Sequence, residues 1–267
     1  MGQGPGFSFA SVVLSYFLVG GGMFTAMLIA GFARVTGELT LYAMMAGGAF
    51  VGGFVAGRAS RGETVLEPAI GAIGVIATVV GLAAGTEVGR LIWHVDSDGT
   101  MKFLGLVGGL AAGGALGGAW ISERLLGEST ASAAPWILHS ALAAFGACLI
   151  STVVTTVILS TSSFAEAANA NAMGTALIAG IALGCLLAGL AVGASARVRP
   201  ILGAFVGGLA GTAGFAVLLA RSAGGDGGGQ DELLIISLFA SGGGIVTAIG
   251  AAIGWATVGK TAGTPAS

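Results

Sequence analysis

The residues that could perform nucleophilic, acid–base or metal chemistry are few in this chain. The histidines are His94 and His139, the cysteines are Cys148 and Cys185, and no two of these four stand at the spacing of a known metal motif. His94 falls in a polar connector, and we expect His139 to be a satisfied residue near a membrane interface. Both cysteines lie in apolar segments and are expected to act as small core residues. The sequence therefore predicts no enzyme, no cofactor and no metal site.

Ion-coupled carriers leave a different trace, because they keep ionisable side chains at membrane depth despite the free-energy cost. Here the Asp, Glu, Lys and Arg residues fall in polar connectors or near the ends of apolar segments. Glu87 and Arg90 are the deepest of them. They stand three residues apart, and we expect them to pair with each other near the interface.

A hydroxyl-rich surface marks the fifth apolar segment, at Ser151, Thr152, Thr155 and Thr156. Such side chains could line a path for a small neutral solute. They more often bond to a carbonyl of the preceding helical turn or across to another helix. We favour the structural interpretation and keep a passive channel or carrier as the alternative function.

Composition indicates what surrounds these residues. Of 267 residues, 55% are hydrophobic and 8% are charged, and the formal net charge is −2. A soluble domain usually carries about a quarter charged residues, which its wetted surface requires. The 51 glycines would weaken helices in water, but glycine is frequent in transmembrane helices. The chain is predicted to lie in a lipid bilayer, and it has no basic field with which to bind nucleic acid.

A bilayer-spanning helix needs about 20 apolar residues. Eight segments meet this requirement, which predicts an all-α, polytopic transmembrane helical bundle. They are residues 9–32, 39–57, 68–86, 103–121, 136–159, 172–193, 200–220 and 233–258. The connectors on the side of both termini carry more Lys and Arg, so we expect the termini in the cytoplasm and the chain in the plasma (inner) membrane of a bacterium.

Features of the first half recur in the second half of the chain. Gly57 matches Gly193, and Trp120 matches Trp255, each within a similar local pattern. This indicates a duplication of a four-helix unit, with residues 1–127 as the first repeat and 128–267 as the second in one continuous bundle. Because each unit has an even number of spans, the repeats are expected to be parallel in the membrane.

Glycines at four-residue spacing supply the strongest local pattern. Such positions share one helix face and leave a groove that another backbone enters. The predicted helix-packing glycines are Gly53, Gly57, Gly81, Gly85, Gly105, Gly109, Gly113, Gly117, Gly203, Gly207 and Gly211. Such a groove accepts a helix of the same chain or of another subunit. Several segments carry glycine on a second face, which favours partner helices. We therefore expect a non-catalytic subunit of a larger membrane assembly, formed with other membrane subunits or by self-association.

Overall fold

Every regular element in the described part of the chain is an α-helix. The computed structural model describes residues 7–59, 65–85, 97–126, 134–161, 170–196, 199–222 and 230–259. The helices are α1 (Phe9–Phe32), α2 (Glu38–Ala59), α3 (Leu66–Gly85), α5 (Ser97–Leu126), α6 (Ala134–Thr161), α8 (Ala170–Ser195), α9 (Ile201–Ser222) and α10 (Gln230–Gly259). The all-α prediction is confirmed.

Most of the described helices are long and apolar enough to cross a bilayer. Seven of those described satisfy both conditions, and α3 contributes a shorter apolar stretch, Leu66–Gly81, beside α1 and α5. A 20-residue helix is about 30 Å long, which is the thickness of the hydrocarbon core. The chain is a multi-pass helical membrane protein. Several helices exceed their predicted spans because the polar turns at their ends continue the helix; α5 extends the predicted 103–121 segment at both ends.

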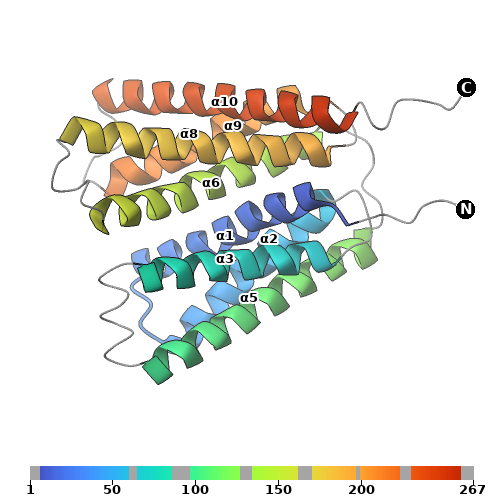
Figure 1. Ribbon diagram of the computed structural model, residues 1–267, viewed down its shortest axis with the longest axis vertical. Helices are drawn as coiled ribbons and strands as arrows, with labels where there is room; N and C mark the ends of the chain where they lie inside the picture. Colours follow the sequence, from blue (N-terminus) through green and yellow to red (C-terminus); the bar gives the residue numbers. More distant parts are fainter. Residues whose placement is uncertain are drawn as a thin grey trace, which may run out of the picture.

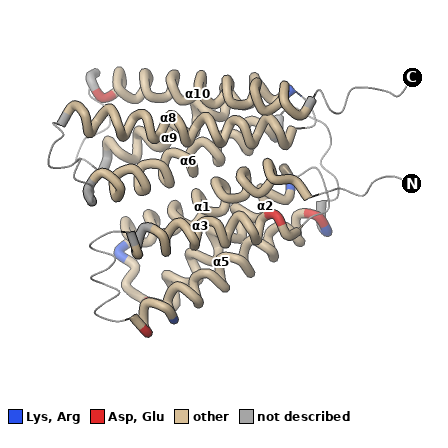
Figure 2. The backbone as a smooth tube through the Cα atoms, viewed as in Figure 1, with Lys and Arg blue, Asp and Glu red and all other residues tan. Residues whose placement is uncertain are grey.

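Charged residues gather at the two ends of the bundle (Figure 2). Between these ends the helices carry apolar and small residues, so the middle of the bundle offers lipid an uncharged surface. Many large apolar side chains are exposed along this middle zone, including Leu187, Ile178 and Ile249. Lipid accepts such side chains without the cost that water imposes, which accounts for their exposure.

The bundle consists of two rings of four helices. In the first ring α1 contacts α2 and α3, and α5 contacts the same two helices. In the second ring α6 contacts α8 and α9, and α10 contacts those two. Figure 1 shows the rings as two layers, with α5 and α10 at opposite edges of the molecule and α1 and α6 facing each other between the layers. The order of contacts along the chain is thus the same in both halves.

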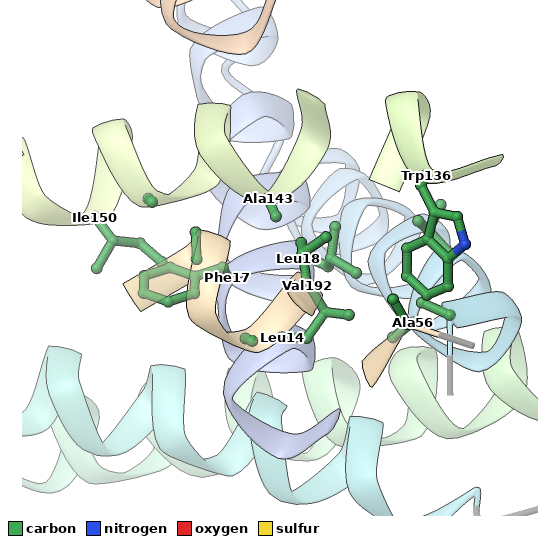
Figure 3. Packing of buried hydrophobic residues seen from close by; sticks show 14 residues of the cluster. Leu14, Phe17, Leu18, Ala56, Trp136, Ala143, Ile150 and Val192 are labelled. Carbon is green, nitrogen blue, oxygen red and sulfur yellow. The ribbon is translucent and has the colours of Figure 1, made fainter. Parts of the chain in front are cut away.

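A buried cluster joins the two rings. It combines Leu14, Phe17 and Leu18 of α1 with Ala143 and Ile150 of α6, and it continues to residues of α2 and α8 (Figure 3). Alanine and glycine occupy many of the remaining buried positions, so the helices approach one another closely. The two rings therefore share a buried core among the described residues. The predicted division between residues 127 and 128 lies outside the described residues and stays a prediction.

Candidate functional site: the glycine faces

Helices α2 and α5 of the first ring approach each other closely. A Cβ added at Gly53 would overlap the carbonyl oxygen of Ala115, and one at Gly57 would lie 3.1 Å from the Cα of Ala119. From the other side, a Cβ at Gly118 would overlap the carbonyl oxygen of Phe50. Each helix thus presses its backbone into a groove of the other. A side chain larger than hydrogen at these positions would separate α2 from α5.

The same crossing recurs between α8 and α10 in the second ring. A Cβ at Gly193 would overlap the carbonyl oxygen of Ala251, and one at Gly254 would overlap that of Leu190. These contacts repeat the approaches of Gly53 to Ala115 and of Gly118 to Phe50, with a constant sequence separation along each helix. The two rings therefore share a packing geometry as well as an order of helices.

Neighbouring turns of these glycine-rich helices make nearly equal contacts. Gly193, which meets Ala251, pairs equally well with Gly53, which meets Ala115, and with Gly57, which meets Ala119. The matches of Gly57 with Gly193 and of Trp120 with Trp255 therefore stay predictions.

The predicted glycines of α9 pack against α6. A Cβ at Gly203 would lie 3.0 Å from the Cβ of Trp136, and Cβ atoms at Gly207 and Gly211 would overlap the carbonyl oxygens of Ile137 and Ala141. In α3, Gly81 faces open space among the described residues. The side-chain surroundings of Gly85 lie outside the described residues.

The glycine row of α5 that dominates the sequence faces open space along most of its length among the described residues. A Cβ at Gly105, Gly109 or Gly113 would meet nothing within 4 Å, and one at Gly117 would meet only the ring of Phe50, at 3.8 Å. The contact with α2 uses the neighbouring face, through Gly114 and Gly118. We name this row the α5 groove; it consists of Gly105, Gly109, Gly113 and Gly117. It is a shallow surface groove along an outer edge of the bundle.

Several close glycines were not among the predicted packing positions. Gly21 of α1 meets Gly146 of α6, with a Cβ at Gly21 placed 2.7 Å from the Cα of Gly146. Gly22 and Gly48 face each other so that a Cβ on either would overlap the other's carbonyl oxygen. The run of three consecutive glycines at residues 20–22 was the available signal. Three consecutive residues point in three directions around α1, and these glycines meet residues of α3, α6 and α2.

Two of the four hydroxyls predicted in the fifth segment lie against glycines of α8. A Cβ at Gly184 would overlap the hydroxyl of Ser151, and one at Gly180 would overlap that of Thr155. Thr156 is exposed on the outside of α6, and the buried hydroxyl of Thr152 has no hydrogen-bond partner. Ser151 and Thr155 therefore occupy a helix–helix contact. Thr152 and Thr156 point elsewhere, so the four hydroxyls do not form one row along a path.

The titratable side chains are scattered. His139 is buried against Trp136, with ring centroids 5.3 Å apart, and its Nδ1 has no hydrogen-bond partner, contrary to the expectation of a satisfied histidine. The sulfur atoms of Cys148 and Cys185 lie 3.7 Å apart in the core between α6 and α8. His94 and the Glu87–Arg90 pair lie outside the described residues. Within the described part of the chain, no three His, Cys, Asp or Glu residues gather as metal ligands would.

No protein-family model, no curated protein and no solved structure matches this chain. The geometry of the glycine faces is therefore the basis on which a function is proposed.

Proposed function

We propose that the chain is a non-catalytic structural subunit of a larger membrane assembly, held together through the α5 groove. The observation that carries this proposal is the contrast between the two glycine faces of α5. Helix α2 packs against Gly114 and Gly118. A Cβ added at Gly105, Gly109 or Gly113 would meet nothing within 4 Å. Glycine in a helix exposed to lipid gains no packing and weakens the helix. A row of such positions is useful when another helix enters it.

The second ring supplies a surface of matching shape. Ala115 and Gly118 make the same kinds of backbone contact as Ala251 and Gly254, and the same number of residues separates Ala115 from Ala251 and Gly118 from Gly254. That separation also carries Gly109, Gly113 and Gly117 onto Ile245, Ile249 and Ile253. These isoleucines are 51%, 50% and 47% exposed. The face that is a groove on α5 is therefore a ridge on α10, with the same four-residue spacing; we call it the α10 ridge.

The placement of groove and ridge favours a second copy of the chain as the partner. The α5 and α10 helices lie at opposite edges of the molecule and run in the same direction (Figure 1). Two copies in the same membrane orientation would therefore bring the ridge of one beside the groove of the next at similar depth. Such a contact joins different surfaces of identical subunits, so it generates closed rings or rows.

Cross-linking between differently tagged copies tests the proposal. In a background with Cys148→Ala and Cys185→Ala, one copy carries Gly113→Cys and the other carries Ile249→Cys. Mild oxidation in native membranes should join the two tags. Pairs that both carry Gly113→Cys or both carry Ile249→Cys serve as controls and should remain unjoined.

Assembly size provides the second arm of the test. Gly113→Leu fills the groove and should reduce the assembly purified in mild detergent to single chains. Gly174→Leu is the matched control, since Gly174 of α8 also meets nothing within 4 Å and lies outside both surfaces. A foreign subunit recovered in stoichiometric amount from native membranes, and lost with Gly113→Leu, would support the subunit role and overturn self-association. An unchanged assembly in Gly113→Leu would overturn both.

A further inference from the structure

An apolar cavity opens between α1, α2 and α6, where the two rings meet. Its volume is about 250 Å³. Its floor is formed by buried residues such as Leu18 and Ala26, and Leu142 and Phe145 of α6 form one wall. Exposed Ile29 and Val51 stand at its rim, 54% and 55% exposed. The cavity therefore opens sideways, on the outer surface of the bundle and not at either end.

The cavity reflects a difference between the two rings. On one side of the α1–α6 contact, α8 packs against α1. The equivalent helix on the other side is α2, which makes only a slight contact with α6. Helix α8 fills the space next to α1 in the second ring. The corresponding space between α2 and α6 is not filled by any described helix, and it forms the cavity. Small residues enlarge it, since Gly21, Gly22, Gly47 and Gly48 all line the cavity.

Water is a poor occupant of this space. The one hydroxyl in the lining, on Thr25, donates its hydrogen to the carbonyl oxygen of Gly21 at 2.7 Å. The rest of the lining is hydrocarbon or glycine, and a buried water needs two to four polar partners. Apolar cavities of about 150 Å³ stay dry and take up apolar ligands such as benzene. The cavity here is larger than that, so an apolar guest is favoured.

The depth of the cavity in the bilayer indicates which apolar molecule it binds. Gly22 lies near the middle of α1, Gly48 near the middle of α2 and Phe145 near the middle of α6. In a spanning bundle these positions are at the hydrocarbon core of the bilayer, where acyl chains are the abundant apolar groups. We propose that this cavity is a binding site for an acyl chain of a membrane phospholipid, which enters between α2 and α6.

Gly47 provides a direct way to close the site. It lines the cavity and is exposed, and a Cβ added there would meet nothing within 4 Å. A leucine at this position should fill the cavity without displacing a helix. Its neighbour Gly48 offers no such variant, because a Cβ there would overlap the backbone of Gly22. Val51→Phe is a second variant, which narrows the entrance from the rim.

Photo-cross-linking in liposomes tests the proposal. The purified chain is reconstituted with a phosphatidylcholine that carries a diazirine near the end of one acyl chain, and labelled residues are located by mass spectrometry. Labelling along residues 21–29 and 47–51 should exceed that at Ile178, an ordinary exposed residue of α8. In Gly47→Leu the labelling of residues 21–29 should fall to the level at Ile178, while Gly174→Leu should label as the parent does.

The outcomes separate the possible occupants. Cavity labelling no higher than that at Ile178 in the parent chain overturns the proposal, as does labelling that survives both Gly47→Leu and Val51→Phe. Labelling by a diazirine-bearing free fatty acid but not by the phospholipid overturns the assignment to phospholipid. Loss of lipid labelling in the cavity when two copies of the chain are cross-linked would also overturn the proposal, because a second copy would then cover the cavity. Circular dichroism and assembly size establish that each variant is folded.

Discussion

Gly21 of α1 and Gly146 of α6 bring the two halves of the molecule into backbone contact. A Cβ on Gly21 would lie 2.7 Å from the Cα of Gly146, and one on Gly146 would overlap the carbonyl oxygen of Phe17. Helices in lipid gain little from hydrophobic burial against each other, so close packing of this kind supplies much of their association. Phe17, whose carbonyl oxygen faces Gly146, also belongs to the buried cluster that the two rings share (Figure 3).

Gly146→Leu should therefore weaken the join between the rings. Forcing a leucine into a packed helix contact typically costs about 1–3 kcal/mol, and backbone on the opposing side leaves little room for relief. The expected result is a lower midpoint of thermal unfolding in detergent. Gly174→Leu, on an open face of α8, should leave the midpoint close to that of the parent. Equal midpoints for the two variants would contradict the packing described here.

The repeated crossing predicts that equivalent glycines are equally sensitive. Gly118→Leu and Gly254→Leu each place a side chain against a carbonyl oxygen of the facing helix, at Phe50 and Leu190 respectively. Each should lower the free energy of unfolding by about 1–3 kcal/mol. Unfolding in mixed detergent measures both, with Gly242→Leu as the control at an open position of α10. A large loss in one variant and none in the other would show that the two crossings differ.

Hydropathy alone predicted the helices well, whereas the helix-packing faces needed the structure. The apolar segments match the observed helices because the requirement for lipid acts on each span separately. On α5, glycines stand on more than one face, and spacing alone does not tell which face α2 covers. The choice depends on residues of the partner, such as Phe50, whose backbone meets Gly118. The same limitation leaves Gly193 with two counterparts one turn apart, Gly53 and Gly57, in the matching of the two halves.

Substitution of Glu67 tests the contact between the start of α3 and the start of α1. Its carboxylate accepts a hydrogen bond from the backbone N–H of Ser8 at 2.6 Å, and the residue is 2% exposed. Glu67→Ala removes the acceptor of this part-buried hydrogen bond, which should lower the free energy of unfolding by about 0.5–1.5 kcal/mol. Glu67→Gln keeps an oxygen acceptor and should recover part of the loss. Thermal unfolding of the two variants provides the comparison; a Gln variant less stable than the Ala variant would contradict the assigned bond.

Substitutions at the contact of α6 with α8 distinguish a packing role from a transport role for the hydroxyl groups of α6. Ser151 occupies the groove at Gly184, so Gly184→Leu should destabilise the bundle, whereas Ser151→Ala should be tolerated. Ser151→Ala should also leave the permeability of proteoliposomes to small neutral solutes unchanged. A solute flux that requires the Ser151 hydroxyl would contradict the packing role and favour the channel alternative.

The central claim is that lipid is the solvent for the outer surface of the bundle, where residues such as Ile178 and Leu202 are 62% and 74% exposed. The most direct measurement is the size distribution of the detergent-purified chain after the detergent is removed, by light scattering, with and without added phospholipid. The chain should aggregate in plain buffer and remain dispersed, with full helicity, when lipid nanodiscs are supplied. A monodisperse, helical chain in buffer without any amphiphile would contradict the account.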